Sequence, residues 1–202
     1  MSEAPVRATI IADASYCHTT KAGGYGTWIS MDGGKRVQRS GVIQGSPENS
    51  TEAELKAVMI GIWYAYKLGA TQLLVQTDCM TVIDVLRNKP HAAQAWLRKI
   101  FYAAKAEHFP HCQISARHVK GHTNVKDARS HVNRWCDHHA GIAMRQERKR
   151  RLGPKHGPSE LDYSLARKYG IALPGKRKRK HPDSERFKAA MLAIPAPNPK
   201  EA

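Results

Sequence analysis

Four acidic residues stand at positions where their side chains could share one site: Asp13, Glu54, Asp78 and Asp137. Asp13 and Asp78 each follow a short apolar run that predicts a buried strand, and open α/β sheets place their ligand sites at such strand ends. Glu54 and Asp137 lie near the starts of two expected helices, and Glu54 falls on the apolar side of its helix. A carboxylate beside a core is costly unless a cation or hydrogen bonds compensate its charge.

The chemistry that such a set supports is hydrolysis of a phosphodiester. Mg²⁺ prefers oxygen ligands, and two metal ions about 3.5–4 Å apart can activate a water and stabilise the departing oxygen. Mn²⁺ is the alternative metal. Taken singly, each acid also has an ordinary explanation, as a strand-end cap or as a charge at a helix N-terminus. Because three of them lie at the ends of elements of one expected sheet, we predict a joint metal site.

The elements that must position these acids follow from the spacing of apolar residues and from turn signals. Apolar runs predict five strands, over residues 8–12, 27–31, 36–44, 73–76 and 113–119. Apolar residues at helical spacing predict four helices, over residues 50–69, 82–86, 92–108 and 132–148. The order βββαβααβα indicates an α/β fold, a mixed five-stranded sheet with flanking helices.

Positive charge is concentrated toward the end of the chain. The net charge of the 202 residues is +16, and +10 of it lies in residues 145–202, where 148–151 and 176–180 are basic runs. Such clusters favour polyanions, because phosphate contacts release counterions. We therefore expect a folded domain over residues 1–147 and a basic tail over residues 148–202 that binds nucleic acid. Because the tail has few apolar residues, we expect it to be largely disordered.

The cysteines and the length of the apolar segments indicate in which cellular compartment the protein works. The cysteines, which are scattered without a CxxC pair, fit free thiols in a reducing compartment; they are Cys17, Cys79, Cys112 and Cys136. The first residues contain no apolar run typical of secretion, and no segment approaches the ~20 apolar residues that a membrane helix needs. We expect an intracellular, cytoplasmic protein (nuclear if the host is eukaryotic) that has no membrane partner and is a monomer.

Five groups of motif residues, in this order, resemble the type 1 ribonuclease H family over residues 7–145. They are Ile11-Ala12-Asp13-Ala14-Ser15 with Gly23-Gly24-Tyr25-Gly26, then Ala53-Glu54-Leu55, Thr77-Asp78, Val119-Lys120-Gly121-His122, and Asn133-x-x-Cys136-Asp137. Each motif alone is weak evidence, but all five in order on the expected elements are a specific signal.

The resemblance implies a ribonuclease H-like fold and an endonuclease that hydrolyses the RNA strand of RNA–DNA hybrids. It implies that two Mg²⁺ ions are held by Asp13, Glu54, Asp78 and Asp137. It also implies that His122 assists proton transfer to the leaving group or the departure of product. From the residue alone the case for His122 is weaker, because an imidazole in a polar loop can carry a proton near neutral pH but most loop histidines are inert.

Three other interpretations use the same part of the chain. A zinc site could draw on His131, Cys136, His138 and His139, but their spacing matches no paired zinc motif, and Cys136 and His138 fall on different faces of a helix. A non-catalytic nucleic-acid-binding protein would gain nothing from carboxylates that face phosphate. A DNA nuclease of related fold, such as a junction resolvase, is compatible with the fold, although the Lys-Gly-His and Asn-x-x-Cys-Asp motifs favour the ribonuclease.

Overall fold

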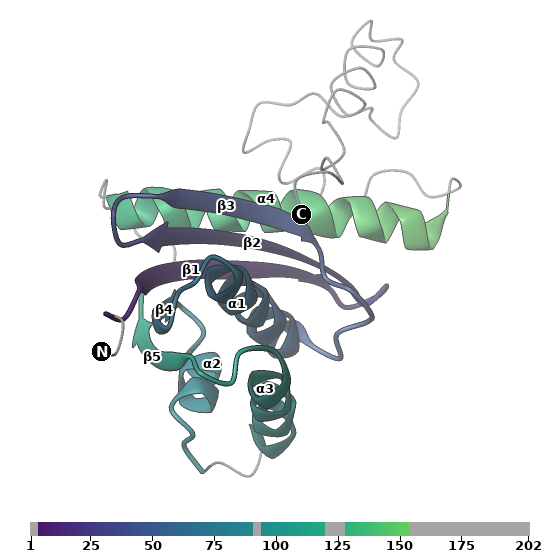
Figure 1. Cartoon of the computed structure of the whole chain (residues 1–202). Helices are drawn as coiled ribbons and strands as arrows, with labels where there is room; N and C mark the ends of the chain where they lie inside the picture. The colour runs from purple at the N-terminus through teal and green to yellow at the C-terminus, as the bar shows by residue number, and fades with distance from the viewer. Residues whose placement is uncertain (1–3, 91–93, 120–127, 154–202) are drawn as a thin grey trace, which may run out of the picture. The chain divides into compact units, whose positions relative to one another are not determined.

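In the computed structural model, which describes residues 4–90, 94–119 and 128–153, the centre of the fold is one mixed sheet (Figure 1). Its strands are β1 (Arg7–Cys17), β2 (Ala22–Met31), β3 (Arg36–Val42), β4 (Gln72–Thr77) and β5 (Gln113–His118). Their order across the sheet is β3-β2-β1-β4-β5. The first three pair in antiparallel fashion, whereas β4 and β5 run parallel to β1. The predicted mixed five-stranded sheet is confirmed.

The described helices cover both faces of this sheet. They are α1 (Ser50–Lys67), α2 (Met80–Leu86), α3 (Ala95–His108) and α4 (Ala128–Leu152). α1 packs across β1 and β2 on one face, with α2 and α3 on the same side, and α4 lies across β1, β2 and β3 on the other (Figure 1). β1 and β2 are therefore enclosed between α1 and α4. None of the described helices is long and apolar enough to cross a membrane.

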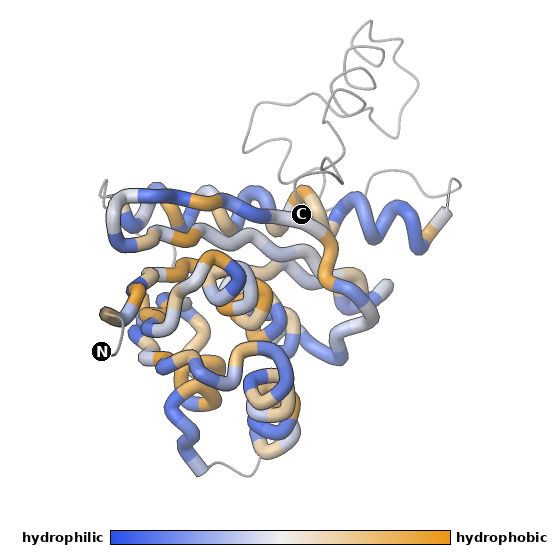
Figure 2. Tube along the Cα trace, viewed as in Figure 1, coloured by the Kyte–Doolittle hydropathy of each residue, from blue (hydrophilic) through white to orange (hydrophobic). Residues whose placement is uncertain are grey.

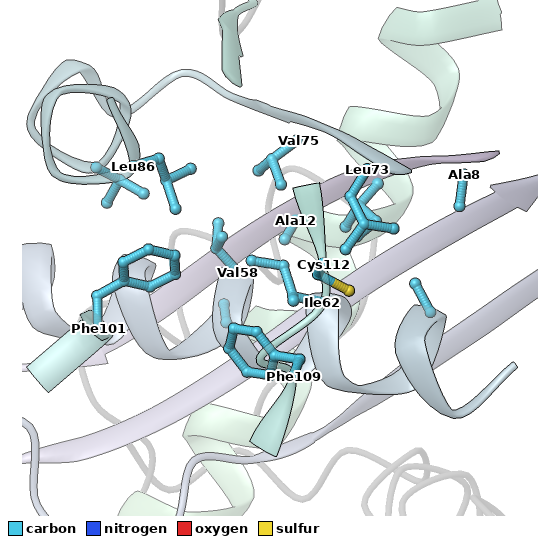
Figure 3. Close-up of a cluster of buried hydrophobic side chains, with 14 of the residues drawn as sticks. Ala8, Ala12, Val58, Ile62, Leu73, Val75, Leu86, Phe101, Phe109 and Cys112 are labelled. Atoms are coloured by element: carbon cyan, nitrogen blue, oxygen red, sulfur yellow. The ribbon is translucent and has the colours of Figure 1, made fainter. Parts of the chain in front are cut away.

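The main core lies between α1 and the sheet and extends to α2 and α3 (Figure 3). Val58 and Ile62 of α1 are fully buried, as is Val75 of β4, and Phe101 and Phe109 close the cluster at α3. Burying one side chain of this size stabilises the fold by ~1.5–3 kcal/mol. This apolar packing fixes the position of α1 against β1.

The first turn of α1 is held by two hydrogen bonds of Glu52. The backbone N–H of Glu52 donates to the side chain of Asn49 at 2.9 Å, and the carboxylate of Glu52 accepts from the backbone N–H of Glu48 at 2.7 Å. The side chain of Asn49 thus caps the helix, and the carboxylate of Glu52 holds the residue before the cap, a variant of the capping box. Gly69, with a φ of +91°, follows the other end of the helix. The predicted helix over 50–69 agrees with this element.

α4 differs from the prediction at both ends. It begins at Ala128 rather than at residue 132, and it continues to Leu152. Gly153, with a φ of +74°, ends the helix, and its N–H donates to the carbonyl of Lys149 at 3.1 Å. The basic run 148–151, which the sequence assigned to the tail, is therefore helical. Residues 154–202, including the run 176–180, lie outside the described residues.

Arg151 fastens the end of α4 to two loops. Its guanidinium donates to the carbonyl oxygens of Thr20 and Lys21 at 3.0 Å each and to that of Gly45 at 2.6 Å. Its Nε also donates to the carboxylate of Glu147 at 2.7 Å, and that side chain is only 6% exposed. Arg151 thus serves the fold, and the expectation that the whole run contacts phosphate is corrected at this residue.

Candidate active site

β1 places Asp13 just beyond the point where its pairing with β4 ends. The last paired residues are Ile11 and Gln76, and on the other side Asp13 lies opposite Gly26 of β2. The carboxylate Oδ1 accepts a hydrogen bond from the backbone N–H of Ala14 at 2.9 Å. Because the β1 backbone continues without a β4 neighbour, the Asp13 side chain lies at a gap that other elements can reach.

α1 brings Glu54 to the same backbone group. The Oε2 atom of Glu54 accepts from the N–H of Ala14 at 3.1 Å, so one N–H lies between the carboxylates of Asp13 and Glu54. The two carboxyl groups also hydrogen-bond to each other when one of them holds a proton. Two acids that are 41 positions apart in the sequence therefore form a contacting pair.

Asp78 follows the last residue of β4, Thr77, and precedes α2. Its charge acts on both Asp13 and Glu54, which shows that the three carboxylates are near one another. The sequence-based reasoning placed Asp78 at the end of a buried strand, and the structure agrees with that placement and shows that the strand runs parallel to β1.

α4 supplies Asp137 because its backbone packs directly on β2. A Cβ atom at Gly26 would lie 2.3 Å from the carbonyl oxygen of Cys136, and one at Gly24 would lie 2.2 Å from that of Ala140. Only glycine permits this approach, since real Cβ atoms essentially never lie so close to backbone atoms. The next residue along α4, Asp137, is thereby brought near Asp13, and their charges interact.

The electrostatics of this cluster are those of acids that lack a counter-charge. Burial raises the pKa of Asp13 to about 7, and the charges of Asp78 and Asp137 act in the same direction. Burial and then the charges of Asp13 and Asp78 raise the pKa of Glu54 well above its ordinary value. A divalent cation would relieve this repulsion, and an all-oxygen ligand set fits Mg²⁺ or Mn²⁺.

The four carboxylates match Mg²⁺ or Mn²⁺ in their charge and in their ligand type. No group of three or more His, Cys, Asp and Glu side chains within residues 4–90, 94–119 and 128–153 is arranged so that it could hold a metal ion. Of the predicted site residues, the structure therefore brings Asp13, Glu54, Asp78 and Asp137 into one cluster without closing them around an ion. His122 lies in 120–127, outside the described residues.

The residues considered for zinc have other surroundings. The thiol of Cys136 is buried and donates to the carbonyl of Ile11 at 3.5 Å, and burial raises the pKa of this thiol. His131 meets the ring of Trp28 edge-on, with centroids 6.5 Å apart, while His139 lies against Trp135 at 4.1 Å. These contacts assign Cys136 to the interface between α4 and the sheet and the two histidines to an aromatic cluster.

Sequence reasoning missed the reason for the glycines in β2. The sequence predicts a strand that starts at residue 27 and leaves Gly23–Gly26 outside it. β2 in fact begins at Ala22. The signal that could have revealed the contact is a pair of glycines two positions apart, which places both on one face of a strand.

Comparisons with known proteins agree with this architecture. The family model described as reverse transcriptase-like matches residues 12–128. No curated protein matches the chain. Among solved structures, RNase H1 of Halobacterium salinarum is 18% identical with a TM-score of 0.55, and the match covers 69% of this chain and 98% of that one.

Two further solved structures are similar to the same extent. The N-terminal RNase H domain of a Mycobacterium tuberculosis protein, solved as a fusion with maltose-binding protein, is 23% identical with a TM-score of 0.54, over 68% of this chain and 98% of that one. The RNase H domain of prototype foamy virus is 18% identical with a TM-score of 0.52, over 71% and 97%. Because these sequence identities are low, the three structures show that the chain shares their fold.

Proposed function

The chain belongs to the reverse transcriptase-like family and has the RNase H-like fold, and from this membership we propose that it is an endonuclease that hydrolyses the RNA strand of RNA–DNA hybrids. The observation that carries the proposal is the gathering of four carboxylates from β1, α1, the end of β4 and α4. A buried cluster of like charges destabilises a fold, so its presence calls for a functional reason. Holding divalent cations against phosphate is that reason.

In the proposed mechanism, Asp13, Glu54, Asp78 and Asp137 hold two Mg²⁺ ions, or Mn²⁺ in their place. When bound, such ions supply an activated water and stabilise the oxygen that leaves the phosphorus. The chain's own contribution is to keep the acids in place before substrate arrives. The N–H of Ala14 holds the oxygens of Asp13 and Glu54, and the contact of Gly26 with Cys136 sets the position of Asp137.

His122 completes the proposal through the family resemblance alone. We assign it a role in proton transfer to the leaving oxygen or in the release of product. An imidazole can do either near neutral pH, because both of its protonation states are populated there.

The test is hydrolysis of a labelled RNA–DNA hybrid by the full chain, beside duplex DNA and duplex RNA, with and without Mg²⁺. We expect Mg²⁺-dependent cleavage of the RNA strand of the hybrid only. Asp13→Asn and Asp78→Asn should abolish cleavage, whereas Asp32→Asn, which changes an exposed acid in the turn after β2, should not. Cleavage of duplex DNA in preference to the hybrid would favour the resolvase-type alternative. Cleavage at the wild-type rate in Asp13→Asn would refute the carboxylate site.

A further inference from the structure

One side of α4 carries an arginine close to the candidate site. Residues that are four apart on a helix lie on one side, one above the other. Asp137, Gly141 and Arg145 form such a row, and Gly141 is buried while Arg145 is half-buried. Gly141 is about 6 Å along the helix axis from Asp137, given a rise of 1.5 Å per residue.

Gly141 makes room for the guanidinium of Arg145. A Cβ atom at position 141 would lie 2.9 Å from Nη1 of Arg145, 3.7 Å from its Cζ and 3.8 Å from its Nη2. The side chain of Arg145 therefore runs back toward the N-terminal end of α4, as helical side chains tend to do. Its positive charge lies over Gly141, roughly one turn from Asp137.

The surroundings of Gly141 differ from those of the other closely packed glycines. At Gly24, Gly26 and Gly61 an added Cβ would meet atoms of another element, so packing between elements accounts for them. At Gly141 the three nearest atoms all belong to Arg145. Glycine within a helix destabilises it by ~0.5–1 kcal/mol relative to alanine, and at position 141 the first group that an alanine Cβ would displace is the guanidinium of Arg145.

The row also follows the strand that carries Asp13. Burial raises the pKa of the Cys17 thiol, but hydrogen bonds with Thr20 and Thr19, and after them the charge of Arg148, lower it overall. Arg148, three residues beyond Arg145, therefore lies near the C-terminal end of β1. The turns of α4 nearest its C-terminus are hydrophilic (Figure 2). A nucleic-acid strand whose phosphate reaches the four acids would meet an arginine on this side of the helix.

We propose that Gly141 and Arg145 form a phosphate-binding site for the nucleic-acid strand beside the four carboxylates. The inference rests on the proposed function for the identity of the ligand. Four carboxylates repel the phosphates that flank the one being hydrolysed. Arg145 supplies a fixed positive charge one turn away, and a guanidinium binds phosphate oxygens with charge-assisted hydrogen bonds.

The first test removes the charge. In the full chain, Arg145→Ala should raise both the KM and the Kd for a labelled hybrid about tenfold, with kcat within about twofold of wild type. It should also lower the slope of log K against log salt by about one unit, the value for one lost phosphate contact. The matched control is Lys99→Ala, which removes an equal charge from α3, on the other face of the sheet from α4. Lys99 is exposed.

The second test fills the space above residue 141 that the guanidinium of Arg145 occupies, and it keeps the charge of Arg145. Gly141→Ala should raise the melting temperature by about 1–4 °C, since alanine favours the helix, and yet raise the Kd for the hybrid severalfold because Arg145 is displaced. In the Arg145→Ala background, Gly141→Ala should have no further effect on binding. A merely structural role of Gly141 predicts additive effects instead.

Failure of this inference can be told apart from failure of the proposed function. Cleavage by the wild type, with equal salt slopes for Arg145→Ala and Lys99→Ala, would overturn the phosphate site alone. The phosphate site would also be overturned if Arg145→Ala changed the Mg²⁺ concentration needed for cleavage but left the Kd for the hybrid unchanged. Arg145 would then act through Asp137. If the wild type cleaves no hybrid, the Kd and its salt slope still decide whether Arg145 binds the backbone.

Discussion

The raised pKa of Asp13 predicts that the protein is destabilised by its own site as the pH rises in the absence of metal. The pKa is about 7 in the folded state against an ordinary value of 3.8. Between these two values the unfolded chain has released the proton that the folded chain retains, so the folded state loses relative stability with each pH unit. Above pH 7 the full cost is present, and below pH 3.8 it vanishes.

The size of this destabilisation follows from how far the pKa of Asp13 is raised. About three pKa units at 1.36 kcal/mol each give an upper limit of about 4 kcal/mol. Since Asp13 shares its protons with Glu54 and is not wholly buried, we expect about 1–4 kcal/mol. Asp13→Asn removes this charge with little change in shape. At pH 8 in a metal-free buffer its Tm should exceed that of the wild type by about 2–16 °C, and at pH 4 the two should agree within about 2 °C.

Thermal unfolding at pH 4, 6 and 8 with a chelator measures this difference, with Asp32→Asn as the control for loss of one acidic charge. Added Mg²⁺ should stabilise the wild type more than Asp13→Asn, because the ion binds only the charged cluster. The reasoning is refuted if the gap between Asp13→Asn and wild type is the same at pH 4 and pH 8.

Three other predictions concern the approach of α4, the histidine and the tail. Gly26→Ala places a Cβ 2.3 Å from the Cys136 carbonyl, so α4 must shift by about 1 Å. A shift of that size can lower kcat about 10²-fold. Gly41→Ala, whose Cβ would meet the ring of Tyr25 at 3.2 Å, is the control, and a similar loss in both variants would contradict the reasoning. His122→Ala should slow turnover about 10²-fold or less; inactivation as complete as in Asp13→Asn would instead make His122 a metal ligand. Removal of residues 154–202 should leave the folded domain and kcat intact but raise KM, and if about five phosphates are contacted by the run 176–180, the salt slope should fall by about 4–5 units. Equal slopes would remove the tail from substrate binding.

The sequence by itself determined the elements and the candidate acids. Apolar spacing located the helix that starts at Ser50 and the strands around Ala8–Ala12 and Leu73–Gln76, because local periodicity reflects which side faces the core. The position of Asp78 at a strand end followed from the same pattern. The prediction was wrong for Asp13, because β1 continues to Cys17 through its pairing with β2, and only the pairing with β4 stops before Asp13. The fold class followed from the order of the elements.

Only the tertiary structure decided how α4 meets the sheet. The glycines of β2 weaken a strand locally, and their use becomes visible only when the backbone of Cys136 lies against Gly26. The sequence assigned the run 148–151 to the tail because of its charge, whereas the structure makes it the last turn of α4. In the fold, Arg151 instead binds the carbonyls of Thr20 and Gly45. Residue type determines which groups can interact, whereas partners distant in sequence are determined by packing.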